Sequence, residues 1–133
     1  MTGMAGYTIV NLKDVEDMAP RFGYAPNMES RFARRPLELE NSGLSYFRIG
    51  PDYRMPFGHH HTYQEEIYVV LSGSARIKLD EEIVALGQWD AIRVAATTAR
   101  AIEAGSEGAE ILAFGAPSND NADAQVLPDF WRD

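Results

Sequence analysis

The sequence predicts an all-β domain in which short strands form a closed barrel or a double-sheet jelly roll. From Leu44 onward, short runs of β-branched and aromatic residues recur about every ten residues, with Gly, Pro, Asp or Ser between them. After residue 40, no segment has the hydrophobic periodicity of a long helix. Many short strands with tight turns favour an architecture that hides its strand edges.

The first 40 residues are predicted to form an irregular N-terminal arm that lies over the barrel. Tyr7–Leu12 is rich in β-branched residues and predicts a short strand. Asp14–Met18 predicts one helical turn that Pro20 would stop. Met28–Arg35 predicts a second short helix, which ends at Pro36 because a proline disfavours helical geometry in the residue before it.

The predicted barrel occupies residues 41–117, and residues 118–133 form a C-terminal tail. The expected strands are Leu44–Ile49, His59–Tyr63, Glu66–Leu71, Ala75–Leu79, Ile83–Leu86, Ala91–Val94, Arg100–Glu103 and Glu110–Phe114. Turn residues such as Gly50-Pro51-Asp52 and Ser72-Gly73-Ser74 separate them. The tail is polar until its last residues, where two aromatic side chains would dock it on the barrel or on a second subunit.

Length, composition and charge restrict the classes of function. The 133 residues have the length of one ordinary domain, and the absence of cysteine excludes disulfides, thiolate metal sites and a cysteine nucleophile. The net charge of −8 argues against nucleic acid or an anionic membrane surface as the main partner. No apolar run approaches the roughly 18 residues that span a bilayer, and no signal segment is recognisable at the N-terminus. We therefore expect a cytoplasmic protein.

The three histidines of the chain are consecutive: His59, His60 and His61. Because side chains alternate along a strand, His59 and His61 share one face and His60 points the other way. Glu66 opens the next strand and can meet the two imidazoles if the chain bends back near Tyr63. Two neutral imidazoles and one carboxylate form the facial set associated with non-haem Fe(II), and they also suit Mn, Ni or Zn. Such a set leaves coordination positions free, as catalysis at a metal requires.

The stretch from His59 to Gly73 resembles the first motif of the cupin superfamily, which is H-x-H, three or four residues, E, six residues, G. Glu66 fits with four residues before it, and Gly73 fits with six after it. Glu65 satisfies only the shorter spacing and leaves Gly73 misplaced, so Glu66 is preferred. The glycine that usually stands six residues before the first histidine is replaced by Tyr53. The resemblance, to a small single-domain bacterial cupin, implies a jelly-roll β-barrel (a double-stranded β-helix) with its site in the lumen.

The second cupin motif, G-x5-P-x-G-x2-H-x3-N, is degenerate. A register anchored on Asp90 places Arg100 at the usual histidine position, whereas counting from Gly87 places Thr98 there. The fourth metal ligand of the superfamily is missing in either register. Arg100 stays cationic and cannot coordinate a metal, but its guanidinium group can hold the carboxylate of a bound ligand through two hydrogen bonds.

The resemblance and these residues leave three functions open. Two of them describe a cupin that binds a small molecule. In the third, the protein serves as a partner of other proteins, and the imidazoles only fill its lumen. In the first, a divalent ion (Fe, Mn, Ni, Zn or Cu) lies beside a small anionic molecule, and its ligands are His59, His61 and Glu66. The expected ligand-binding residues are Arg100, Tyr68 and Thr98. The second is a metal-free cupin module that binds a small ligand through Arg100. Dioxygenase, isomerase and decarboxylase chemistry all occur in the superfamily, so the sequence assigns no reaction. Small cupins commonly pair, so we also expect a homodimer.

Overall fold

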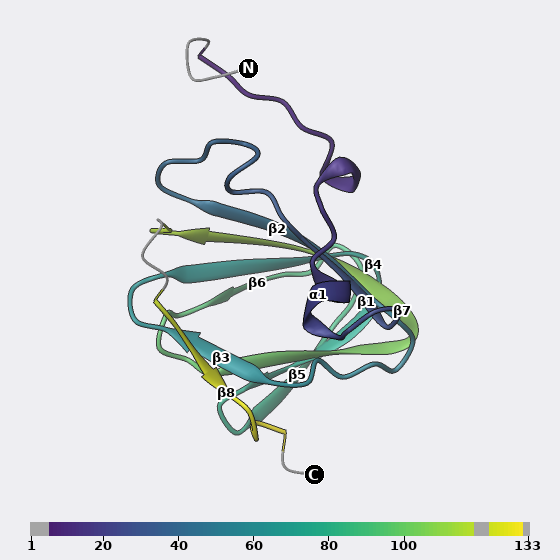
Figure 1. The fold of residues 1–133 in the computed structure, drawn as a ribbon. Coiled ribbons are helices and arrows are strands. Elements are labelled where there is room, and N and C mark those ends of the chain that lie inside the picture. Colours follow the sequence, from purple (N-terminus) through teal and green to yellow (C-terminus); the bar gives the residue numbers. More distant parts are fainter. Residues whose placement is uncertain (1–5, 119–122, 132–133) are drawn as a thin grey trace.

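The computed structural model describes residues 6–118 and 123–131. These residues form an eight-stranded sheet that curls around an interior (Figure 1). The strands are β1 (Met28–Phe32), β2 (Gly43–Ile49), β3 (Gly58–His61), β4 (Glu65–Leu79), β5 (Glu82–Leu86), β6 (Ala91–Val94), β7 (Arg100–Ala116) and β8 (Ala124–Leu127). Two short helical segments precede them, the 3-10 turn η1 (Leu12–Asp14) and α1 (Ala19–Phe22). No helix among the described residues is long and apolar enough to cross a membrane.

Two long strands, β4 and β7, hold the sheet together. Strand β7 pairs with β2, β3 and β4, and β4 pairs in addition with β5 and β6, always in antiparallel orientation. The β4–β7 register is interrupted between Val70 and Ala75, where Gly73 has a φ of +74°. A Cβ atom on Gly73 would stand 2.0 Å from the carbonyl oxygen of Gly108, so the two strands approach this closely only because residue 73 is glycine.

This irregularity explains the main difference between the expected and the observed strands of the barrel. Ser72-Gly73-Ser74 is a predicted turn, but the chain continues through it as one strand, so Glu66–Leu71 and Ala75–Leu79 both belong to β4. The last two expected strands likewise belong to β7. The sequence predicts a turn between two strands where the structure has a bulge within one strand. Glycine and serine are common in turns and in bulges, so the residues alone do not distinguish them.

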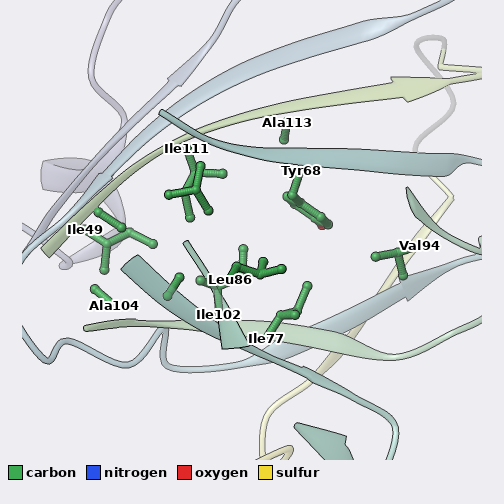
Figure 2. Packing of buried hydrophobic residues seen from close by; sticks show 12 residues of the cluster. Ile49, Tyr68, Ile77, Leu86, Val94, Ile102, Ala104, Ile111 and Ala113 are labelled. Atoms are coloured by element: carbon green, nitrogen blue, oxygen red, sulfur yellow. The ribbon is translucent and has the colours of Figure 1, made fainter. Parts of the chain in front are cut away.

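The hydrophobic core lies inside the curled sheet (Figure 2). Inward-facing side chains of the two long strands, such as Val70, Ile77 and Ile111, are fully buried. Ile49 of β2 and Leu86 of β5 close the cluster from neighbouring strands. The all-β jelly-roll barrel predicted from the sequence is therefore confirmed.

The N-terminal segment differs from the prediction. Met28–Arg35 does not form a helix, because Met28 and Ser30 are buried on one face of β1 while Glu29 forms ion pairs on the other, a repeat of two residues rather than the helical 3.6. Tyr7–Leu12 belongs to none of the strands in the described part of the chain. The expected helical turn at Asp14–Met18 is also wrong, since η1 ends at Asp14 and α1 begins only at Ala19.

Pro20 does not stop a helix but lies in the first turn of α1. A proline is tolerated there because its missing N–H would have no partner within the helix.

The C-terminal tail contains a strand that the sequence analysis did not predict. Strand β8 pairs with β3, with His59 opposite Val126 and His61 opposite Ala124. Farther along, the indole Nε1 of Trp131 donates a hydrogen bond to the carbonyl oxygen of Met55 at 3.0 Å. The tail thus runs along the strand that carries the histidines (Figure 1).

Candidate metal and ligand site

The structure brings the three predicted metal ligands together in the lumen. Nε2 of His59 lies 3.3 Å from Oε1 of Glu66, and Nε2 of His61 lies 3.4 Å from the same oxygen. The two imidazole rings are 5.0 Å apart at an interplanar angle of 83°. One ligand atom from each of the three residues lies within 4.8 Å of the others. This is the convergence that strand alternation and the spacing to Glu66 predict; their role as ligands stays a prediction.

Glu66 is held by neighbouring side chains of the same region. Its Oε1 accepts a hydrogen bond of 2.6 Å from the hydroxyl of Tyr68, and its Oε2 accepts one of 3.2 Å from the amide of Gln64. Burial raises the pKa of the Glu66 carboxyl group, but the two neighbouring imidazoles and the hydroxyl of Tyr68 outweigh burial and hold this pKa well below its ordinary value. Burial and the Glu66 charge raise the pKa of Tyr68. Glu66 is therefore an anion, and Tyr68 a neutral hydrogen-bond donor.

Asp123, which sequence reasoning did not find, orients His61. Its Oδ1 lies 2.7 Å from Nδ1 of His61, and its Oδ2 accepts backbone N–H bonds from Thr62, Tyr63 and Gln64 at 3.1, 2.7 and 3.0 Å. Burial raises the pKa of Asp123, but these N–H groups and His61 lower it to about 2. An ionised carboxylate only accepts hydrogen bonds, so Nδ1 of His61 carries the proton.

That hydrogen bond leaves Nε2 of His61 to face Glu66. Burial lowers the pKa of the His61 imidazole, but the carboxylates of Glu66 and Asp123 raise it above its ordinary value. A second proton would therefore occupy Nε2 more readily than it would in water. Such a proton would compete with any metal ion that binds at Nε2.

Arg100 begins β7 directly across from His59, and its side chain is buried, only 1% exposed. Its Nη2 donates to the carbonyl oxygen of Ala95 at 3.1 Å, and its Nη1 lies 3.6 Å from Oε1 of Glu66. Within the described part of the chain, neither Nε nor Nη1 makes a hydrogen bond. The buried guanidinium therefore has unused donors beside the imidazoles.

The two registers of the second motif lead to different places. Arg100, from the register anchored on Asp90, lines the same cavity as His59 and Tyr68. Thr98, from the alternative register, lies in the turn before β7, and its backbone N–H donates to the carbonyl oxygen of Ala95 at 3.1 Å. Thr98 is not among the described residues that line the cavity. Of the three predicted ligand-binding residues, the structure gathers Arg100 and Tyr68 around the cavity and leaves Thr98 outside it.

The donor set fits a divalent cation held by His59, His61 and Glu66. Nε2 of His61 is buried and makes no hydrogen bond to a described residue, while a carboxylate holds the other ring nitrogen. Metal-ligating histidines almost always have such a partner on the second nitrogen. Arg100 adds a positive charge beside the same carboxylate, which weakens the attraction for a metal ion. The chain thus offers three ligands and one opposing charge.

Comparison with known proteins identifies the fold. No family model matches the sequence, and no curated protein is significantly similar to it. A cupin protein from Bacteroides fragilis matches at a TM-score of 0.71 and 22% identity, over 98% of this chain and 99% of that one. The polyketide cyclase RemF from Streptomyces resistomycificus matches at 0.71 and 21%, over 95% and 87% of the two chains. Oxalate decarboxylase from Bacillus subtilis matches at 0.70 and 23%, over 89% of this chain and 33% of that one. The protein therefore has the cupin fold, as the motif from His59 to Gly73 predicts.

Proposed function

We propose that the protein binds a divalent metal ion through His59, His61 and Glu66, and that it binds or acts on a small anionic molecule beside that ion. The observation that carries this proposal is the buried Nε2 of His61, which faces Glu66 while Asp123 holds the opposite ring nitrogen. The similar structures support a small-molecule site, because they include an oxalate decarboxylase and a polyketide cyclase.

Each residue of the site has a physical role in this proposal. A divalent ion supplies a Lewis acid that polarises an oxygen of the bound molecule. Asp123 holds the His61 imidazole in the tautomer that offers Nε2, and Gln64 and Tyr68 keep the Glu66 carboxylate in place. Arg100 directs two unused donors toward an anionic group. A cation and a guanidinium beside one carboxylate leave the site positively charged, which selects an anionic ligand.

A metal-free binding module is the second candidate, and a specific observation favours it. Oε1 of Glu66 already has four cationic or hydrogen-bonding neighbours: the hydroxyl of Tyr68, both imidazoles and Nη1 of Arg100. This contact set balances the Glu66 charge with protein groups alone. In this candidate function, Arg100 alone anchors the anionic ligand.

Metal analysis of protein purified without nickel chromatography distinguishes the two candidates. We expect one equivalent of Fe, Mn, Ni, Zn or Cu, or a rise in melting temperature when one of these metals is added. The variants His59→Ala and Glu66→Gln should lose metal uptake while they remain folded. The matched control is His60→Ala, because His60 is not among the described residues that line the cavity. Metal-free protein whose melting temperature does not change with any added metal would leave only the second candidate.

We further propose that the protein is a cytoplasmic homodimer. The described segment before η1 supports a dimer, because Tyr7 is 70% and Ile9 82% exposed there and the segment extends away from the sheet (Figure 1). Sedimentation should show a dimer that dissociates when residues 1–10 are deleted. A monomer at all concentrations would contradict this part of the proposal.

A further inference from the structure

The cavity that contains the site has two chemically different parts. It has a volume of about 440 Å³, within the range of sites for small organic molecules. Its charged and imidazole part includes Glu66 of β4, Arg100 of β7, and His59 and His61 of β3. A second part of the wall is largely apolar and comes mainly from α1, the segment after it, β1, β2 and the loop before β3. The aromatic side chains of this second part are Phe22, Tyr24, Phe32, Phe47 and Phe57.

The aromatic rings of this wall pack against one another in two groups. The ring of Tyr24 lies 6.0 Å from that of Phe22 and 6.1 Å from that of Phe57. The rings of Phe32 and Phe47 are 5.9 Å apart at 81°, an edge-to-face contact. Phe22 and Phe32, which both line the cavity, nevertheless remain 51% and 44% exposed, so the wall includes aromatic surface that no described residue covers. Such a surface gains free energy when an apolar group of a ligand covers it.

The polar part of the cavity favours an anion for a separate reason. The guanidinium of Arg100 is buried, and two of its nitrogens donate to no described residue. Buried donors without acceptors are costly, and a charged group more so. The carboxylate of Glu66 is the nearby anion, but its oxygens already accept from Tyr68 and Gln64. A second carboxylate would supply the missing acceptors through paired hydrogen bonds.

We infer that the ligand of this cavity is an aromatic carboxylate, with its acidic group at Arg100 and its ring system against the aromatic wall. A short diacid would satisfy Arg100 but leave the wall uncovered, and a polyol would bring neither a negative charge to Arg100 nor apolar surface to the wall. The inference rests on the proposed anionic site and adds the apolar half of the ligand, which the metal triad does not specify.

Calorimetric titration of the wild-type protein with four probes tests both halves of the inference. The probes are acetate, benzoate, 1-naphthoate and the neutral 1-naphthylmethanol, each titrated with a chelator present so that binding does not depend on metal. We expect 1-naphthoate to bind about 100-fold more tightly than acetate, because its rings bury much more apolar surface. Benzoate should lie between them. The neutral alcohol should bind at least about tenfold more weakly than 1-naphthoate, because it cannot pair with the guanidinium.

The outcomes separate this inference from the proposed function. Equal affinity for acetate and 1-naphthoate would overturn the aromatic half and leave the anionic site intact. Equal affinity for 1-naphthoate and 1-naphthylmethanol would overturn the anionic half, and with it the role of Arg100 in the proposed function. Absence of binding by all four probes would overturn the inference, whereas a failure to bind metal in the separate analysis would leave it standing.

Two matched variants locate the aromatic contact. Phe32→Ala should weaken 1-naphthoate about tenfold and leave acetate unchanged, since only the ring system reaches the wall. Phe114→Ala is the control, because Phe114 is 45% exposed but is absent from the described lining of the cavity. Equal effects of the two substitutions would contradict the proposed location. Arg100→Gln should weaken 1-naphthoate but not the alcohol; if this variant does not fold, the comparison of the two probes on wild-type protein carries the same information.

Discussion

At the residue scale, the convergence of His59, His61 and Glu66 was predictable, but the carboxylate that orients one of them was not. Alternation along a strand places both histidines on one face, and the spacing to Glu66 needs only a bend of the chain. Asp123 lies 62 residues from its partner His61, in a polar tail with several acidic residues. No local pattern distinguishes Asp123 from the others, so only the fold reveals its contact. The unused donors of Arg100 likewise depend on burial, which the sequence motif does not encode.

Replacement of Asp123 should weaken metal binding without removing a metal ligand. In Asp123→Asn, the amide lacks the charge that holds the proton on Nδ1 of His61. Nε2 is then less often the unprotonated nitrogen that can bind a metal ion. We expect the dissociation constant for Zn²⁺ or Mn²⁺ to rise about 10- to 100-fold, the usual effect of removing such a partner. Calorimetric titration with metal measures it. Asp129→Asn, an exposed residue of the same tail, should behave as wild type; unchanged affinity in folded Asp123→Asn protein would show that the hydrogen bond does not orient the ligand.

At the scale of elements, the sequence predicted the strands of the barrel better than β1. Most barrel strands carry several β-branched or aromatic residues, such as the run from Ile67 to Val70 in β4, whereas β1 has the polar Ser30 at a buried, inward-facing position between Met28 and Phe32. Its opposite face bears charges that make sense only once β2 lies beside it: Glu29 forms ion pairs with Arg31 and with Arg48 of β2. Long-range pairing thus decides the conformation of a segment whose local pattern is ambiguous.

The charged face of β1 gives a pH-dependent contribution to stability. A hydrogen bond from Arg48, with further hydrogen bonds from Arg31 and Lys13, lowers the pKa of Glu29 from 4.5 to about 2, against burial. A carboxyl group with a lowered pKa stabilises the fold at pH values above its ordinary pKa of 4.5. This contribution is lost as the pH falls from 4.5 toward 2. Glu29→Gln should therefore lower the free energy of unfolding by about 2 kcal/mol at neutral pH.

Urea unfolding at several pH values measures this effect. The difference between Glu29→Gln and wild type should shrink as the pH approaches 2. Glu65→Gln is the matched control, because Glu65 and its partner Arg93 are both largely exposed and lie 3.5 Å apart. Such a surface pair should contribute about 0.5 kcal/mol or less. If the difference in free energy of unfolding between Glu29→Gln and wild type does not change with pH, the contribution of Glu29 to stability is not electrostatic.

At the scale of the whole molecule, turn spacing predicted a barrel, and the sequence placed the site in its lumen through the first motif. The closure of that barrel beside the site was not predicted, because β8 lies in a segment with no strand pattern before Leu127. Strand β3 pairs with both β7 and β8, and these pairings exist only once the sheet has assembled. The aromatic wall of the cavity also depends on assembly, since its side chains come from segments throughout the first half of the chain.

Removal of the C-terminal tail should therefore affect both stability and the site. A protein that ends at residue 118 lacks Asp123 and leaves the edge of β3 unpaired, as well as losing the contact of Trp131 with Met55. We expect a lower melting temperature together with a loss of metal affinity greater than in Asp123→Asn. Trp131→Ala is the comparison, because it removes the contacts of Trp131 with Met55, Arg54 and Phe130 but keeps Asp123 and β8, and it should lower the melting temperature while metal affinity stays unchanged. Wild-type metal affinity in the shortened protein would contradict this link.

The pairing of β8 with β3 has a consequence for synthesis of the chain. Ribosomes make the chain from the N-terminal side, so β3 and its histidines emerge well before the segment that completes their surroundings. While the ribosome still encloses the tail, His61 lacks Asp123 and the edge of β3 remains open. During translation, the metal and ligand site can therefore be completed only once Asp123 and β8 have left the ribosome and paired with β3.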